Sequence, residues 1–436
     1  MAATSTFDPS DPANERLPLR VFALCLCMTI ILSGTLYTLS YFVRSATWLI
    51  WLIIFYLLFQ FRREFRLGRL MLPLLPYLGW LYFYLIWALI VAPYPDIPFA
   101  LKVATTTTTL GLCMAVLTAR PNYLRLFATF AQMTVVLNFV ILWPLLHSPK
   151  WTAIIMAANG HSETYAYGVG LRYGGIWGNS NMVGYMCLII LIMGFLAAPW
   201  AAWAGRITAI PLLYLAVSRK SIILLVLIIF MYLLVVKRRE FKFWLMAFVL
   251  VVAGGITLTL ADGLRAQSKQ ANENPIFARL MDLEEKDTAM RGGETRKDLL
   301  HHWVTIINEE PWYGYGLHSM AGNLFDENDP EKVLFRGRFP LGTHNTYLGV
   351  WVETGLVGLI AFLAAMIHYV RKCLTSGKLP ITKWVLISLM LVNLIFLMVS
   401  HNHLFCFEGK IIFTMFFLLP SSYGLKALGS RISQTA

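Results

Sequence analysis

Long apolar segments alternate with short polar connections along almost the whole chain. A helix needs about 20 predominantly apolar residues to cross the hydrocarbon core of a bilayer, which is roughly 30 Å thick. Windows of that length predict twelve membrane spans, two of them short, with one long polar connection after the ninth. The spans lie near residues 18–41, 45–61, 71–92, 99–118, 126–147, 181–198, 207–217, 221–236, 243–260, 347–370, 383–401 and 410–428.

The pattern divides the chain into three parts. Residues 1–260 hold the first nine spans, residues 261–346 form the long loop, and residues 347–436 hold the last three spans. A connection of this length is too long for a bare linker and is typical of a functional segment. We therefore expect an all-α integral membrane protein of about twelve transmembrane helices, with one large external loop that contains amphipathic helices.

The composition agrees with this fold class. Hydrophobic residues make up 58% of the chain and charged residues only 14%, against about 25% charged residues in an ordinary soluble domain. A folded soluble protein cannot hide so much apolar surface from water. The composition therefore excludes a soluble enzyme, a disordered chain and a disulfide scaffold.

The basic residues predict the orientation. The net charge is +13, from 36 Lys and Arg against 23 Asp and Glu. With the N-terminus inside, the cytoplasmic connections and termini hold 19 Lys and Arg, whereas the short outside connections hold 7. This bias is typical of cytoplasmic loops, so we expect both termini in the cytoplasm and the long loop outside. The positive charge needs no nucleic-acid partner to explain it.

The middle of the long loop carries a helical pattern. Between Glu294 and Glu310 apolar residues recur at helical spacing, and Pro311 ends the pattern. We predict an amphipathic helix over the mouth of the membrane domain, followed by a turn at Gly314 and Gly316. The apolar positions are Leu299, Leu300, Trp303, Ile306 and Ile307, and the aromatic residues expected at the membrane interface are Trp312, Tyr313 and Tyr315.

Two adjacent cations, Arg219 and Lys220, lie on the predicted outer side of the membrane, where short loops rarely carry Lys or Arg. They separate apolar runs of about eleven and sixteen residues, so we expect a hairpin tip recessed below the outer surface. A cation at such depth costs roughly 2.5–3.5 kcal/mol to insert and usually marks a site. One interpretation is an anion site for the phosphate of a lipid carrier, and the other is two side chains that snorkel to the interface.

Two further polar clusters precede spans on the outer side. Arg172 is a candidate phosphate or sugar contact, and Asn181 can cap the helix that follows it. His344 lies just before the tenth span and can take a proton from a sugar hydroxyl, because histidine titrates near neutral pH; a structural role is the alternative. Glu353 falls inside that span, where a carboxylate needs a partner: a helix-terminus amide, an arginine or the substrate.

Cysteines and threonines within the spans are interpreted as packing residues. The six cysteines show no metal-ligand spacing and no disulfide framework. The hydroxyls of Thr105 to Thr109 can bond back to carbonyls of their own helix. Phosphate-loop and dinucleotide-binding motifs are also missing, so we predict neither a cofactor nor a metal.

Together these motifs resemble the O-antigen ligase and polymerase family. That family shows an arginine fifteen residues before Pro-x-x-Gly-x-Gly, then His-Asn-x-x-Leu and Glu-x-Gly-x-x-Gly. This chain matches the motifs in order with Arg296, then Pro311, Gly314 and Gly316, then His344, Asn345 and Leu348, then Glu353, Gly355 and Gly358. Upstream, Ser218 and Arg219 resemble the family's Ser-Arg-small turn, with Lys220 in place of the small residue, and residues 172–181 resemble its Arg-x-x-Gly…Asn pattern.

The resemblance implies a GT-C-like glycosyltransferase of the bacterial inner membrane that acts on the periplasmic face. The donor would be an undecaprenyl-diphosphate-linked glycan, and the acceptor of a ligase would be the lipid A-core. By analogy, His344 would act as general base in an inverting reaction without a metal. The residues implied to bind the donor diphosphate are Arg219, Arg296, Lys220, Arg172 and Arg291, and those implied to support the site are Asn345, Glu353, Asn181, Gly314 and Gly316.

Three functions remain open at this point. The first interpretation is the O-antigen ligase, and the second is an O-antigen polymerase or protein O-oligosaccharyltransferase that uses the same donor. The acceptor is not encoded in any motif that distinguishes them. The third is a transporter of lipid-linked glycans, which predicts internal repeats and midplane charges in both halves of the chain. We find no convincing repeat.

Overall fold

The computed structural model describes residues 19–35, 44–62, 67–92, 95–147, 177, 180–216, 219–237, 246, 249, 296–317, 319, 324–326, 329–335, 345–377, 379–399, 404 and 406–435. Their helices are α1 (Leu19–Leu32), α3 (Arg44–Phe61), α4 (Leu67–Met71), α5 (Leu75–Val91), α6 (Ile97–Ala119), α7 (Pro121–His147), α10 (Ser180–Met193), α11 (Pro199–Ala216), α12 (Arg219–Val235), α15 (Arg296–Glu309), α16 (Thr346–Thr375), α17 (Pro380–Val399), α18 (Phe407–Leu418) and α19 (Tyr423–Thr435). Two short 3-10 helices, η2 (Leu72–Leu74) and η5 (Leu419–Ser421), and two strands, β1 (Leu324–Asp326) and β2 (Asp329–Phe335), complete the elements.

Several of these helices are long and apolar enough to cross a membrane, which confirms the prediction of a helical membrane protein. In the described part of the chain five helices qualify, or six if a bent pair is counted as one span. Four shorter apolar helices accompany them, and the predicted span 243–260 lies almost entirely outside the described residues. The total of twelve stays a prediction. The five are Leu67–Val91, Ile97–Ala119, Pro121–Ile141, Thr346–Thr375 and Pro380–Met398.

The spans predicted over 410–428 and 207–217 have a different form in the structure. The span predicted over 410–428 is not one helix, because α18 and α19 meet at a bend of 66°. Pro420 lacks a backbone donor, and the Ser422 hydroxyl caps α19 by accepting from Leu425 N while it donates to Thr118 O. The span predicted over 207–217 is also wrong at its start, since α11 begins at Pro199 and takes Arg206 into the helix.

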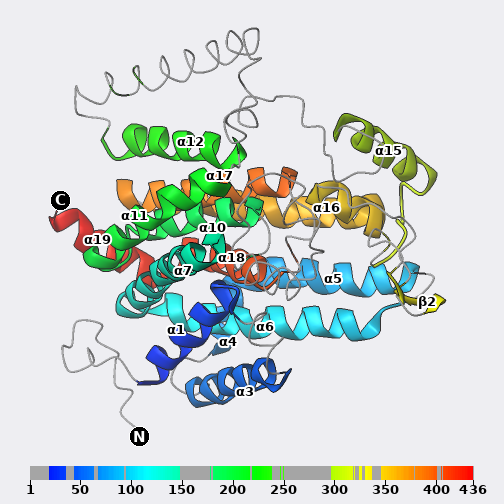
Figure 1. The fold of residues 1–436 in the computed structure, drawn as a ribbon, viewed down its shortest axis with the longest axis horizontal. Coiled ribbons are helices and arrows are strands. Elements are labelled where there is room, and N and C mark those ends of the chain that lie inside the picture. The colour runs from blue at the N-terminus through cyan, green and yellow to red at the C-terminus, as the bar shows by residue number, and fades with distance from the viewer. Residues whose placement is uncertain are drawn as a thin grey trace, which may run out of the picture.

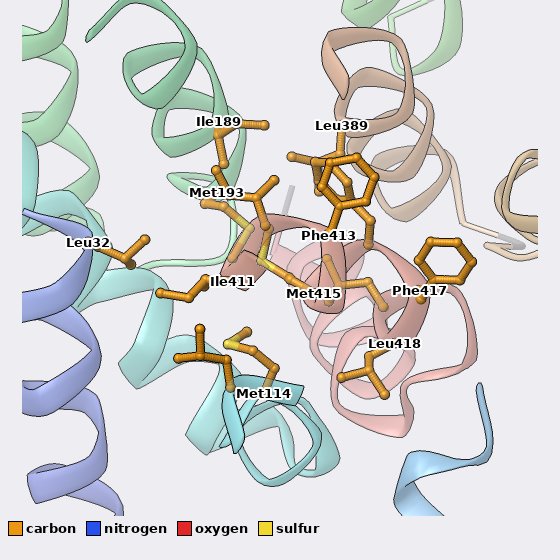
Figure 2. Packing of buried hydrophobic residues seen from close by; sticks show 14 of the residues in the cluster. Leu32, Met114, Ile189, Met193, Leu389, Ile411, Phe413, Met415, Phe417 and Leu418 are labelled. Carbon is orange, nitrogen blue, oxygen red and sulfur yellow. The ribbon is translucent and has the colours of Figure 1, made fainter. Parts of the chain in front are cut away.

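Side chains from distant parts of the sequence meet around α18 to form the core of the bundle. Figure 2 shows residues of α18 facing residues of α1, α6, α10 and α17. Apolar side chains on the outer helices are exposed instead, as expected for surfaces that face lipid. The labelled core residues are Leu32, Met114, Ile189, Met193, Leu389, Ile411, Phe413, Met415, Phe417 and Leu418.

The polar side chains within the spans follow the prediction in part, since the buried Thr107 hydroxyl has no hydrogen-bond partner among the described residues. The Thr105 hydroxyl donates to Leu101 O at 2.7 Å and the Thr106 hydroxyl donates to Lys102 O at 2.6 Å. Thr108 departs from this pattern, because its hydroxyl pairs with the phenol of Tyr82. All six cysteines are free thiols, and five of them are buried. These residues therefore pack the helices.

The bundle has two distinct ends (Figure 1). At one end lie α15 and the two-stranded antiparallel hairpin of β1 and β2, which the pattern analysis did not anticipate. At the other end α19 packs beside α7 and the last turn of α6. At 1.5 Å per residue α6 is about 35 Å long, which is long enough to cross a bilayer core.

Candidate active site

The site is built around a break in α16. Gly355 has φ 66° and ψ −170°, so α16 consists of one helix up to Thr354 and a second helix from Leu356. A break of this kind removes the intrahelical donors for carbonyls just before it and the acceptors for amides just after it. These backbone groups need other partners, because a buried group without a hydrogen bond is costly.

The loop after α15 supplies those partners. Tyr315 N donates to Val352 O at 2.8 Å, and Gly316 N donates to Glu353 O at 3.0 Å. In return, Pro311 O accepts from Leu356 N at 2.8 Å and from the Trp351 indole at 3.0 Å. The Pro-x-x-Gly-x-Gly loop and the Glu-x-Gly-x-x-Gly break thus form one structure, which we term the interlock (residues 311–317 with 351–356).

Three glycines allow the two backbones to approach each other. Gly314 and Gly316 have φ of 76° and 87°, which confirms the predicted turn. A Cβ on Gly314 would lie 2.7 Å from Thr354 N, and a Cβ on Gly316 would overlap the backbone of Ala92. A Cβ on Gly355 would overlap the Trp312 carbonyl. A larger residue at Gly314 or Gly355 would therefore push the interlock apart, and one at Gly316 would push the loop away from Ala92.

Glu353 connects the interlock to α5. Its side chain is only 4% exposed, and its carboxylate accepts a hydrogen bond from the Tyr84 hydroxyl. Tyr84 is itself buried and packs against Trp80, with ring centroids 5.5 Å apart. This phenol is a partner that the sequence analysis did not name. It lies 269 residues away in the sequence, and no local pattern links the two positions.

Asn345 fixes the start of α16. Its side chain accepts from Tyr347 N at 2.9 Å and from Leu348 N at 3.2 Å, which is the geometry of a helix N-cap. The Asn of the His-Asn motif is therefore the cap of α16. The residue before it, His344, lies outside the described residues.

The predicted amphipathic helix is present as α15 and covers the first part of α16. Trp303, Ile306 and Ile307 are buried together with Tyr315 and Val352. The Tyr315 hydroxyl also donates to Ile306 O at 2.9 Å, so Tyr315 is a core residue rather than an interface residue as predicted.

Its two neighbours in the loop remain exposed. Trp312 is 59% exposed and Tyr313 is 57% exposed, as expected for residues at an interface. The Trp87 indole donates to Tyr313 O at 3.2 Å and holds this segment to α5. Sequence reasoning missed Trp87 and Tyr84 because both lie in an ordinary apolar span.

The other predicted residues occupy helix starts or fall outside the described part. Arg219 and Arg296 are the first residues of α12 and α15, and Lys220 follows Arg219. Asn181 lies in the first turn of α10. The argument that Arg219 and Lys220 sit at a recessed tip loses support, because α11 has 18 residues rather than about eleven. Arg172 and Arg291 lie outside the described residues.

Comparison with known proteins agrees with the motifs. Residues 204–363 match the family model described as O-antigen ligase, an interval that contains the whole interlock. A Rickettsia conorii protein named "Putative polysaccharide ligase" is 31% identical over 106 residues, which are 22% of this chain and 25% of that protein. The alignment thus spans about a quarter of the relative's length. The resemblance to the O-antigen ligase family is confirmed over residues 204–363.

Proposed function

Because residues 204–363 match the O-antigen ligase family, we propose that this protein transfers an undecaprenyl-diphosphate-linked glycan to the lipid A-core on the periplasmic face of the inner membrane. The observation that carries the proposal is the interlock. It ties α15, which begins with Arg296, to the first helix of α16, which His344 precedes by two residues. Two motifs of the family are thereby held as one unit at one end of the bundle.

In the proposed reaction a hydroxyl of the core sugar attacks the anomeric carbon of the donor glycan. A new carbon–oxygen bond forms as the bond between that carbon and the diphosphate oxygen breaks, and the undecaprenyl diphosphate leaves with the electron pair. His344 takes the proton of the attacking hydroxyl. Attack from the face opposite the leaving group inverts the anomeric carbon.

Basic residues would stabilise the departing diphosphate without a metal ion. The arginine fork binds phosphate in a bidentate manner, which suits Arg219 and Arg296 to this role. Both stand at helix N-termini, where unpaired amides and the helix dipole also favour an anion. The other residues proposed to bind the donor diphosphate are Lys220, Arg172 and Arg291. Asn345, Glu353, Asn181, Gly314 and Gly316 would support it by fixing the backbone around the reacting groups.

The role of His344 is tested by replacing it with alanine and assaying transfer from purified donor to purified lipid A-core. We expect turnover to fall by about 10²–10⁴-fold, the range typical of a lost general base. His368→Ala is the matched control, because His368 is exposed on the second helix of α16, away from the interlock. Wild-type turnover in a folded His344→Ala protein would remove His344 from the mechanism.

The donor site is tested with Arg219→Ala and Arg296→Ala in the same assay. We expect both variants to weaken the use of donor while the thermal unfolding of the protein is unchanged. Arg371→Ala removes an exposed arginine in the last turns of α16 and is expected to behave like the wild type. Unchanged donor kinetics in both test variants would overturn the assignment.

The chemistry has two further signatures. Nuclear magnetic resonance of the product is expected to show an anomeric configuration opposite to that of the donor. A chelator is expected to leave the rate unchanged. Retention of configuration, or activity that a chelator abolishes and a divalent ion restores, would contradict the proposed mechanism.

The acceptor is identified by mass spectrometry of lipopolysaccharide from cells that lack and then regain the gene. We expect deletion to remove full-length glycan from the lipid A-core and to leave carrier-linked glycan in excess. Capping that survives deletion would exclude the ligase. Altered glycan length would instead indicate a polymerase, and glycan missing from proteins would indicate a protein oligosaccharyltransferase.

A further inference from the structure

A cavity lined by two arginines lies at the end of the bundle opposite the interlock. It has a volume of about 490 Å³ and is framed by α7, α11, α19 and the connection between α10 and α11. Arg125 comes from α7 and Arg206 from α11, and neither belongs to the proposed reaction. The remaining lining is mostly apolar and includes Phe195, Trp203 and Leu428. The cavity therefore combines positive charge with an apolar wall.

The two guanidinium groups are available to an anion. Arg206 lies over the rings of Phe195 and Trp203, at 5.1 Å and 5.5 Å from their centroids. Contact with a ring face uses none of the N–H donors of arginine in a conventional hydrogen bond. Among the residues that the structure describes, no carboxylate forms an ion pair with Arg125 or Arg206. An anion of the right size would thus satisfy donors that the described protein leaves open.

The wall of the cavity continues into an apolar stripe along α11. Trp200, Trp203, Ile207 and Ile210 recur at helical spacing and are each at least 59% exposed. Exposed side chains of this kind on a membrane helix face lipid chains. A small soluble anion gains nothing from such a stripe, whereas a lipid with an anionic head group can bury its acyl chain against it.

Contacts between the helices themselves hold the framework of the cavity. The Gln132 amide of α7 donates to Ile190 O of α10 at 2.7 Å, and its side chain occupies the space that a Cβ on Gly205 of α11 would take. Ala198 N in the α10–α11 connection donates to the Thr129 hydroxyl at 2.9 Å. These contacts hold the three helices at close approach, so little ordering is needed on binding.

We propose that this cavity binds the phosphate of an anionic phospholipid from the leaflet at the α19 end. Arg125 and Arg206 hold the phosphate, and one acyl chain lies along the stripe of α11. Basic pockets between membrane helices bind anionic lipid head groups for the same electrostatic reason. The site is independent of the proposed reaction, which lies at the other end of the bundle.

The test measures lipid binding to the full-length protein after delipidation in a neutral detergent. Native mass spectrometry and thermal unfolding are recorded with phosphatidylglycerol, with phosphatidylcholine of the same acyl chains, and with inorganic phosphate. We expect one phosphatidylglycerol to be retained and to raise Tm, and neither of the other two probes to do so. Equal effects of phosphatidylcholine would show that the head group is not recognised, and equal effects of inorganic phosphate would show a site for a free anion; either result overturns the proposal.

Substitutions of the two arginines test whether the phospholipid binds in this cavity. Arg125→Gln and Arg206→Gln are each expected to weaken binding of phosphatidylglycerol by about fivefold, the contribution of one basic residue near a membrane surface. Arg206→Lys keeps the charge and serves if Arg206→Gln does not fold. Arg69→Gln removes an exposed arginine of α4 outside the cavity and is expected to bind as the wild type does. Equal binding by the double variant Arg125→Gln with Arg206→Gln would refute the site.

Discussion

At the level of single residues, the backbone of Gly355 adopts φ 66° with ψ −170°, a conformation essentially restricted to glycine. The carbonyl of Trp312 and the amide of Tyr313 occupy the space that a side chain would need. The strained backbone conformation and the lack of space both oppose an added Cβ, so this position tolerates no other residue without movement of the interlock.

We predict that Gly355→Ala destabilises the protein, by about 1–3 kcal/mol from backbone strain alone. Gly79→Ala is the matched control, since Gly79 lies inside α5 with nothing within 4 Å of an added Cβ. That change is expected to stabilise by about 0.5–1 kcal/mol, because alanine is the better helix residue. The measurement is thermal unfolding in detergent, and a rise in Tm for Gly355→Ala would contradict the described break.

A second prediction concerns the buried carboxylate of Glu353. Tyr84→Phe removes a hydroxyl that donates to it and is expected to cost about 0.5–1.5 kcal/mol, the net contribution of one hydrogen bond. In the Glu353→Gln variant, Tyr84→Phe is expected to reduce the free energy of unfolding by less. The two substitutions are therefore expected to be non-additive in a double-mutant cycle. Strict additivity would show that the two side chains do not interact.

The conformations of several motif residues could be predicted from the sequence, but their partners in the structure could not. Gly314 and Gly316 could be assigned to a turn because glycine favours positive φ, and Asn345 stands at a position typical of a cap. The break at Gly355 could not be predicted, because its motif lies within an apolar run that is compatible with one continuous helix. Tyr84 could not be predicted either, since its pairing with Glu353 depends on how α5 packs on α16.

At the level of elements, α15 is held to the bundle by a small separate cluster. Its buried residues contact Tyr315 and Val352, whereas the main core lies among the membrane helices. A helix with so few buried contacts is held locally, so it can detach without unfolding of the whole protein.

We predict that Trp303→Ala releases α15 from α16. Removing a buried tryptophan costs about 3–5 kcal/mol in a well-packed core, and Trp303 is fully buried. Hydrogen exchange of the α15 amides is expected to accelerate and glycan transfer to fall, with little change in the membrane helices. Val304→Ala, at a 42% exposed position of the same helix, should change neither quantity. Unchanged exchange in Trp303→Ala would show that α15 is held by other contacts.

The helix pattern predicted α15 well and α11 poorly. In α15 the apolar residues follow the 3.6-residue period and Pro311 ends the run, so the local sequence pattern alone is enough to predict the helix. In α11 the hydropathy pattern predicts that the span begins after Arg206, because an arginine in a membrane helix is costly. The structure keeps Arg206 helical by placing it over Phe195 and Trp203, and that contact depends on tertiary packing.

At the level of the whole molecule, the apolar composition was sufficient to predict a helical membrane protein, and charge bias predicts which end faces the cytoplasm. The positive cavity and α19 share the end predicted to be cytoplasmic, and the interlock lies at the opposite end. Span number is harder to predict than fold class, because broken helices such as α18 with α19 have no distinct hydropathy.

The orientation is tested by labelling single engineered cysteines with a membrane-impermeant maleimide. Tyr313→Cys is expected to react in cells whose outer membrane is permeabilised, and Tyr423→Cys only after the inner membrane is disrupted. Both positions are more than half exposed, and they lie at opposite ends of the bundle. The wild-type protein gives a low background because five of its thiols are buried and Cys406 is partly buried. The opposite labelling pattern would reverse the orientation.

The break at Gly355 also divides α16 into a short first helix and a second helix long enough to cross a bilayer core. The second helix of α16, from Leu356 to Thr375, is about 30 Å long, which equals the thickness of the hydrocarbon core. It is long enough to cross the core unaided, so on the predicted topology the first helix and its Asn345 cap would lie in the hydrated head-group layer. Under the proposed function, solvated sugars would then meet a membrane-anchored donor without losing their water, and Gly355 would lie at the boundary between the two environments.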